Sequence, residues 1–111
     1  MNNPIWQYAK EEGMRCYHRD GTPYGDMEEW AKDFERFPEM RRVAETMLPD
    51  GKWVSTIWLG IDHSFGSGPP LIFETMVFPS QGDWAELDMI RYSTEAAALE
   101  GHAVLVKRWE G

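Results

Sequence analysis

The sequence predicts an α+β protein, with an antiparallel sheet of about four strands and two to three helices packed mainly on one face. Short runs rich in β-branched and aromatic residues alternate with Pro, Asp and Gly turns through the middle of the chain. Segments before and after these runs have the apolar spacing of helices. Hydrophobic residues make up 42% of the 111 residues, enough for a modest core, so one domain over 1–111 is expected.

The start of the chain predicts a short helix followed by a hairpin. An Asn-Pro pair precedes an apolar stripe that ends at a glycine, so a helix near 4–12 is expected within an N-terminal extension, 1–13. A strand is expected over 14–19. An Asp-Gly turn then leads to a short return strand at 22–24, where a proline restricts it to a sheet edge.

The strongest helix prediction covers residues 25–36. Asp26 is the expected N-cap, and Glu29 three residues later forms a capping-box-like pair with it. One apolar stripe follows at helical spacing, formed by Met27, Trp30, Ala31 and Phe34. Pro38 is expected to end the helix.

Four strands are expected next, over 42–48, 53–59, 71–78 and 88–92. A Pro-Asp-Gly turn joins the first two strands into a hairpin. The third run is apolar almost throughout, which is typical of a central strand that is covered on both faces.

The last segment predicts one helix to about residue 108, with Ser93 or Thr94 as its N-cap. Gly101 costs about 1 kcal/mol inside a helix. It therefore marks either a break, with a strand over 103–106, or a place where the helix packs closely against another element. The single helix is favoured, because no cluster of turn residues follows Gly101.

Charge and cysteine content disfavour several classes of protein. The chain carries 19 acidic and 11 basic residues, a formal charge of −8, which argues against direct binding to nucleic acids or anionic membranes. Cys16 is the only cysteine, so no internal disulfide is expected. No apolar run approaches the roughly 18 residues of a membrane span, and the N-terminus lacks signal-peptide features. The expected location is a reducing cytoplasm.

A candidate catalytic or ligand-binding site lies in the segment WLGIDHSFGSGPPLIFETMVF, residues 58–78. Two strands flank a loop too long for a tight hairpin, and long ordered loops often carry function. Asp62 and His63 in this loop, with Glu74 in the next strand, can provide a general base or bind a ligand. The alternative is structural: Asp62 makes local hydrogen bonds, and Glu74 is exposed or at the rim, paired with an arginine such as Arg42.

Metal and cofactor chemistry find little support in the sequence. His63, Glu74 and His102 are residue types that bind zinc or iron, and Cys16 with His18 would share one face of a strand. Compact motifs such as HExxH or CxxC are absent, as are the glycine-rich motifs of nucleotide binding and the GxSxG motif of hydrolases. We therefore expect no metal and no cofactor.

Acidic and aromatic side chains predict a surface that contacts another protein. Trp30, Trp53 and Trp58 are expected in the core, whereas Trp6, Trp84 and Trp109 are expected at the periphery. Tryptophan is a frequent anchor of protein interfaces. The residues predicted to contact a partner are Glu28, Asp33 and Glu35 on the outer face of the 25–36 helix, together with Trp84 and Trp109. Peripheral aromatics also fit a homodimer.

Several patterns in the chain resemble a family of small proteins encoded by bacteriophages and prophages. They are WLGIDHSFGSGPPLIFETMVF and RYSTEAAALEGH, preceded by RDGTPYGDMEEWAKDFE and RRVAETML, and together they cover residues 15–105. The resemblance implies a phage origin and no particular reaction. Small acidic phage proteins often bind and block host machinery, including CRISPR effectors and other defence complexes, and this analogy is independent of fold.

The first functional hypothesis is therefore a phage-encoded, non-enzymatic protein that binds a host protein in the cytoplasm of a bacterial cell. Its specific form is an inhibitor of an anti-phage defence complex such as a CRISPR effector. A nucleic-acid-handling partner fits, because the basic surface of such a protein complements an acidic one. The alternative is a small enzyme, or a metal- or ligand-binding domain, centred on Asp62, His63 and Glu74. A structural homodimer is the third hypothesis.

Overall fold

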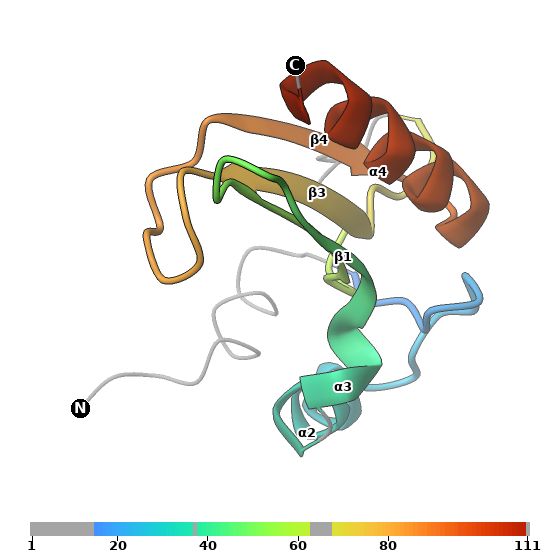
Figure 1. Ribbon diagram of the computed structural model, residues 1–111. Coiled ribbons are helices and arrows are strands. Elements are labelled where there is room, and N and C mark those ends of the chain that lie inside the picture. The colour runs from blue at the N-terminus through green and yellow to red at the C-terminus, as the bar shows by residue number, and fades with distance from the viewer. Residues whose placement is uncertain (1–14, 37, 63–67, 111) are drawn as a thin grey trace.

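The computed structural model describes residues 15–36, 38–62 and 68–110 (Figure 1). The helix predicted near 4–12 and His63 of the candidate site lie outside these residues. The described chain forms the predicted α+β fold, in which a four-stranded antiparallel sheet packs with three helices. Within the described segments, no helix combines the length and the apolar character that a membrane crossing requires.

The strands follow one another across the sheet in chain order. They are β1 (Arg42–Met47), β2 (Trp53–Trp58), β3 (Phe73–Phe78) and β4 (Asp88–Tyr92). Each neighbouring pair is antiparallel, and the bounds agree with the predicted strands to within two residues. β3 lies between β2 and β4, and almost all of its side chains are buried, as expected of a central strand.

Alternation along the strands divides the sheet into two faces. The first face carries Thr46, Val54, Thr56, Thr75 and Val77, which lie opposite one another in the strand register. The second face carries Met47, Trp53, Ser55, Ile57, Glu74, Met76, Phe78, Met89 and Arg91. These two names are used below for these two sets of residues.

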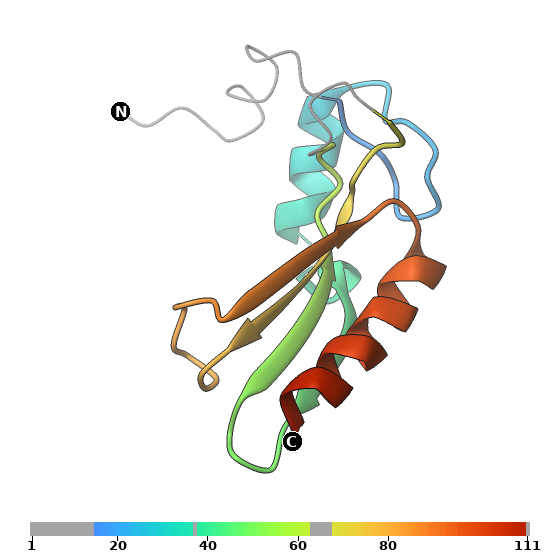
Figure 2. The same cartoon turned by 90° about the horizontal axis from the view of Figure 1, so that it is seen from above.

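Helix α4 (Glu95–Glu110) covers the first face and contacts all four strands (Figures 1 and 2). The Thr94 hydroxyl accepts a hydrogen bond from the Ala97 amide at 3.1 Å, which confirms a predicted N-cap. The helix is continuous through Gly101, so the single-helix prediction is also confirmed. A Cβ atom on Gly101 would lie 2.0 Å from the Tyr92 hydroxyl oxygen, so glycine permits close packing of α4 on β4.

Helix α2 (Met27–Arg36) begins after Asp26, whose carboxylate accepts a hydrogen bond from the Glu28 amide at 2.8 Å. The predicted cap is therefore confirmed. α2 ends at Arg36, before Pro38, as predicted, and a short helix that the sequence did not predict, α3 (Pro38–Arg41), begins at Pro38. Proline fits the first position of a helix, where its missing N–H is not needed. α3 contacts β1 and β2, whereas α2 lies at the end of the sheet (Figure 1), where its Trp30 and Phe34 pack with Trp58.

The predicted hairpin at the start of the chain is only partly present. The turn forms, since the His18 amide donates to the Thr22 carbonyl at 2.7 Å. The predicted strands do not, because the segment makes only isolated bridges, from Cys16 to Ile61 and from Tyr17 to Pro23. The Cys16–Ile61 bridge ties the segment to the residues that follow β2, whereas the Tyr17–Pro23 bridge lies within the segment itself.

Arg19 fastens this segment to two distant elements. Its guanidinium forms an ion pair with Glu95 in the first turn of α4. It also donates to the carbonyl oxygens of Met40 and Arg42, at 3.0 and 3.2 Å. One side chain therefore connects the 15–25 segment to α4 and to the junction between α3 and β1.

Two groups of buried side chains stabilise the described fold. One lies where the 15–25 segment and α2 meet the end of the sheet, and it includes Cys16, Trp30, Trp58, Ile72 and Phe73. The other lies between α4 and the first face, and it consists of Leu48, Val54, Val77 and Leu105. Burying each large side chain contributes about 1.5–3 kcal/mol, which makes these groups the main source of stability.

Candidate functional site

Asp62 lies at one end of the 60–70 loop and bonds to the residue that follows the other end. Its carboxylate accepts a hydrogen bond from the Leu71 amide at 3.0 Å, and its own amide donates to the Arg15 carbonyl at 2.9 Å. The first bond joins the two ends of the loop, and the second fastens the loop to the 15–25 segment. The geometry therefore matches the structural alternative for Asp62. Its neighbour His63 falls in the 63–67 gap between described segments, so its predicted role stays a prediction.

Glu74 is buried in β3 on the second face, with 5% of its surface exposed. Its carboxylate lies 3.1 Å from the Nε atom of Arg91, the residue directly opposite it on β4. The predicted exposed or rim position and the suggested partner Arg42 are therefore wrong, whereas pairing with an arginine is right. Burial raises the pKa of Glu74, and the hydrogen bond and charge of Arg91 oppose that rise.

His102 lies on α4 and points at the first face, with 7% of its surface exposed. Its Nε2 atom is 2.8 Å from the Thr46 hydroxyl, and its Nδ1 atom is 2.7 Å from the Thr56 hydroxyl. The Thr56 hydroxyl also bonds to that of Thr75 at 2.5 Å. Burial lowers the pKa of His102, so the imidazole is neutral near pH 7 and the hydroxyls satisfy both ring nitrogens.

The structure does not bring Glu74 and His102 together. Glu74 is on the second face, and His102 contacts the first face through Thr56. Adjacent residues of a strand point to opposite faces, so the whole thickness of the sheet separates them. Two of the three residues in the set His63, Glu74 and His102 therefore cannot share one metal ion. No cluster of three or more His, Cys, Asp or Glu suited to a metal occurs among the described residues.

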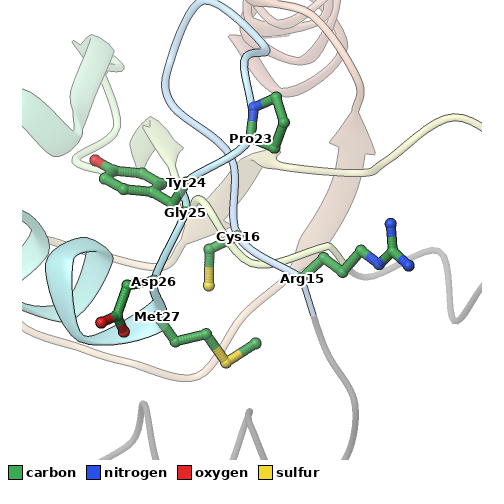
Figure 3. Close-up of a pocket in the computed structure, with 7 residues that line it drawn as sticks. All are labelled: Arg15, Cys16, Pro23, Tyr24, Gly25, Asp26 and Met27. Atoms are coloured by element: carbon green, nitrogen blue, oxygen red, sulfur yellow. The ribbon is translucent and has the colours of Figure 1, made fainter.

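A hollow of about 290 Å³ lies beside the start of α2, and Figure 3 draws the residues that line it. Its lining is Arg15, Cys16, Pro23, Tyr24, Gly25, Asp26 and Met27. The Cys16 thiol is buried, which raises its pKa to about 12 and keeps it protonated. Asp26 is engaged as the N-cap of α2. The hollow therefore offers no reactive thiolate, and its carboxylate already accepts a hydrogen bond from the backbone of α2.

The predicted acidic face of α2 is partly used within the protein. Asp33 accepts a hydrogen bond from the Tyr24 hydroxyl at 3.0 Å, which links α2 to the 15–25 segment. Glu28 forms an exposed ion pair with Lys32 at 3.6 Å. Glu35 is exposed. Of these three carboxylates, Asp33 therefore has a structural contact of its own.

The two predicted interface tryptophans have different environments. Trp109 is partly buried at the end of α4, and its indole N–H donates to the Asp88 carboxylate at 3.0 Å. This bond and a contact with Arg108 lower the pKa of Asp88 and fasten α4 to β4. Trp84, in the loop between β3 and β4, is 72% exposed. Trp84 is thus the candidate with free surface.

Trp84 rests on an aromatic row that crosses the second face. Its ring centroid is 5.4 Å from that of Phe78 and 6.1 Å from that of Trp53, and both contacts are edge-on. Trp53 and Phe78 are themselves paired across β2 and β3 at 5.4 Å. Met47 lies opposite Trp53 on β1 and is 53% exposed. The three rings of Trp53, Phe78 and Trp84, together with Met47 beside them, are called the aromatic row below.

A second hollow, of about 190 Å³, continues along the second face from the aromatic row toward α3. Trp53, Ser55 and Ile57 of β2 form one wall, and Pro38, Arg41, Arg42 and Glu45 form the other. Arg42 is paired with Glu45 at 3.2 Å, and the Arg41 guanidinium lies 4.5 Å from the centre of the Phe34 ring. The hollow is large enough for one aromatic or branched aliphatic side chain.

The sequence predicted that Trp84 is peripheral, but it did not predict the other residues of this surface. Trp53 was expected in the core and is half-buried, whereas Trp30 and Trp58 are buried as expected. Only part of this surface is indicated by the sequence. The loop that carries Trp84 reads PSQGDWAEL, with two acidic residues and no basic one. The register that aligns Met47, Trp53 and Phe78 becomes visible only in the folded sheet.

Comparison of the chain with family models, curated proteins and solved structures found no match.

Proposed function

We propose that this protein is a non-enzymatic binding protein that docks onto another protein through the second face of its sheet. The observation that carries the proposal is the exposure of Trp84, which is 72% accessible although it sits on Phe78 and Trp53. A large aromatic side chain that is held in place by other rings loses little conformational entropy on binding. Such tryptophans are typical anchors of protein interfaces.

The surroundings of Trp84 indicate the chemistry of the partner. Asp83 and Glu86 flank it in the same loop, and both are exposed. Met47, Met76 and Met89 lie on the second face, and methionine side chains adapt their shape to a partner. We expect a partner surface with an apolar pocket for Trp84 and with Lys or Arg at its border.

The phage resemblance suggests a setting for this binding. In our proposal the protein is made during phage infection or from a prophage, and it acts in the cytoplasm of the bacterial host. Its partner is a host protein, and a nucleic-acid-handling complex of anti-phage defence, such as a CRISPR effector, is the specific form. The excess of 19 acidic over 11 basic residues supports contact with the basic surface of such a complex rather than with nucleic acid itself.

The enzymatic alternative has less support. It requires a general base that is free to exchange protons with a substrate. Glu74 is buried and bonded to Arg91, and Asp62 is bonded to the Leu71 amide. Neither carboxylate is therefore free to act as that base.

The test is capture of partners by the tagged full-length protein from a lysate of a bacterial host, analysed by mass spectrometry. Wild type is compared with Trp84→Ala and with Val104→Ala, an exposed apolar position on α4 that serves as the matched control. We expect a stoichiometric host protein with wild type and Val104→Ala, and at least a tenfold loss with Trp84→Ala. Retention by Trp84→Ala would overturn the proposed surface.

Two further arms separate the competing hypotheses. Reversal of charge at Glu28, Asp33 and Glu35 tests the acidic face of α2, and a loss of capture confined to this variant would move the interface there. His63→Ala tests the enzymatic alternative, and we expect this variant to retain the partner. Molar mass in solution tests the homodimer: a dimer that Trp84→Ala dissociates would mean that a second copy occupies the second face.

A further inference from the structure

We propose that two copies of this protein form an antiparallel dimer through the outer face of α4. This face lies on the side of the helix away from the sheet, because Ala98, His102 and Leu105 of the same helix are buried against the first face (Figure 2). The outer face of α4 is the set of its exposed residues, which are Ala96, Leu99, Glu100, Ala103, Val104, Lys107, Arg108 and Glu110.

The outer face of α4 is partly apolar, whereas the exposed side of α2 is charged. Every exposed residue of α2 is ionic, and these residues are Glu28, Glu29, Lys32, Glu35 and Arg36. Half of the outer face of α4 is apolar, with Leu99 and Val104 exposed by 47% and 54%. A helix that is apolar on both sides is normally covered on both sides. Among the described helices and strands, α4 contacts only the four strands, so its outer face has room for a partner.

The outer face of α4 is electrically neutral, unlike the chain as a whole. The chain has a formal charge of −8, so two copies repel each other over most approaches. On the outer face, Glu100 and Glu110 balance Lys107 and Arg108. The 79–87 loop, in contrast, has two acidic residues and no basic one. A second copy can therefore approach α4 without net repulsion from this face.

Two of these charges are placed so that a second copy can pair with them. Glu100 and Lys107 are about two helical turns apart, so they lie on one line along α4. Ala103 and Val104 lie between them. Both charged side chains are exposed, and no ion pair of the described residues includes either one.

The spacing of these charges selects the antiparallel direction. When two copies of α4 cross between Ala103 and Val104 in opposite directions, Glu100 of each copy faces Lys107 of the other, and two ion pairs form. In a parallel arrangement, both contacts would join like charges. Antiparallel helix dipoles favour the same direction. A two-fold axis exchanges the two ends of this pattern, so a second copy provides the complement that each copy needs.

The dimer has a consequence that rests on the proposed function. α4 covers the first face, so a dimer joined through α4 has its two second faces on opposite outer sides. Each second face keeps its own Trp84 exposed. One dimer then binds two partner molecules, or two sites of one assembly, and the second contact benefits from the first through a higher effective concentration.

The experiment measures the molar mass of the full-length protein by sedimentation equilibrium, from micromolar to millimolar concentration. We expect a monomer at the low end and a dimer at the high end, because one helix from each copy forms only a small interface. Unfolding experiments at micromolar concentration therefore report the monomer.

Charge variants test the predicted ion pairs. Glu100→Lys and Lys107→Glu each replace two attractive contacts by two repulsive ones, so each should raise the dissociation constant of the dimer at least about fivefold. The variant with both changes restores both pairs in exchanged positions and should return to within about twofold of wild type. Circular dichroism confirms that each variant is folded.

Glu28→Lys and Lys32→Glu on α2 are the matched controls. They change the net charge by the same amounts at exposed helical positions. At about 0.15 M salt the charge of α2 is screened from the dimer contact, so each control should change the dissociation constant by less than about twofold. Equal effects of the α2 and α4 variants would overturn the proposed contact.

Three further results would also overturn the dimer: a wild-type monomer at all concentrations, failure of the double variant to restore association, or a dimer that Trp84→Ala dissociates. The proposed function fails separately. A dimer that captures no host protein would overturn that function and leave the contact through α4. If host protein is captured, the molar mass of the complex is expected to show two partners for each dimer, and one partner for each dimer would overturn the bivalent arrangement.

Discussion

The two faces of the sheet are made from the same strands but differ in what they do with polar groups and apolar surface. On the first face, α4 covers a polar chain of Thr46, His102, Thr56 and Thr75, in which each group bonds to the next. On the second face, the aromatic row leaves Trp84 and Met47 exposed. A face whose polar groups are hydrogen-bonded within the protein stabilises the fold. A face with exposed aromatic and apolar side chains leaves surface that a partner could cover. The following predictions test this division.

The largest expected effect comes from the apolar contact between α4 and the first face. Leu105→Ala removes a fully buried side chain, and we expect it to lower the free energy of unfolding by about 2–5 kcal/mol. Leu99→Ala on the same helix is the control, because Leu99 is 47% exposed and its loss should cost within about 0.5 kcal/mol. Urea denaturation measures both. Equal effects would mean that α4 does not pack as described.

The close approach of α4 to β4 predicts an inverted effect at Gly101. Replacing glycine by alanine in a helix normally adds about 1 kcal/mol of stability. Here the new Cβ atom would meet the Tyr92 ring, so we expect Gly101→Ala to lower the free energy of unfolding by about 1–3 kcal/mol. In a Tyr92→Leu background the same change should become neutral or stabilising. Thermal unfolding of the four proteins measures this coupling, and additive effects would contradict it.

The polar chain of the first face predicts a pH dependence of stability. Burial lowers the pKa of His102 in the folded state, below the value of about 6.5 in the unfolded chain. The contribution of neutral His102 to the free energy of unfolding is therefore fully present above pH 6.5. It falls as the pH drops below 6.5, because the unfolded state then binds the proton first, with a slope of at most about 1.4 kcal/mol per pH unit.

His102→Gln provides the matched variant for this prediction. Glutamine can still bond to the threonine hydroxyls but does not titrate. We expect the loss of stability between pH 7.5 and pH 5.5 to be smaller in the variant than in wild type, measured by urea denaturation. His18 and His63 are present in both proteins, so the difference reports His102 alone. Identical slopes would show that His102 does not remain neutral in the folded state.

Local patterns predicted most of the fold. The strands were predictable because each is a short run of β-branched and aromatic residues bounded by turn residues. The caps of α2 and α4 were predictable because Asp26 and Thr94 act on amides two or three residues away. The short helix α3 was not predicted, because a proline that ends one helix can also occupy the first position of another, and only the path of the chain decides whether a second helix forms.

The candidate site was much less predictable. Glu74 was recognised as unusual, but its partner Arg91 depends on the register of β3 against β4, which no local pattern states. Trp84 and Trp109 were equivalent in the sequence. In the structure, Trp109 is bonded to Asp88, whereas Trp84 is exposed.

The sequence by itself determined the fold class, the succession of strands and helices, and the acidic charge, because these depend on composition and on neighbours within a few residues. Only the tertiary structure decided which buried polar groups meet and which aromatic side chains remain exposed. These depend on strand register and on how α4 lies over the sheet, where residues 46, 56, 75 and 102 come together. Contacts between residues so far apart in the chain arise from packing of the whole domain, which a local pattern cannot encode.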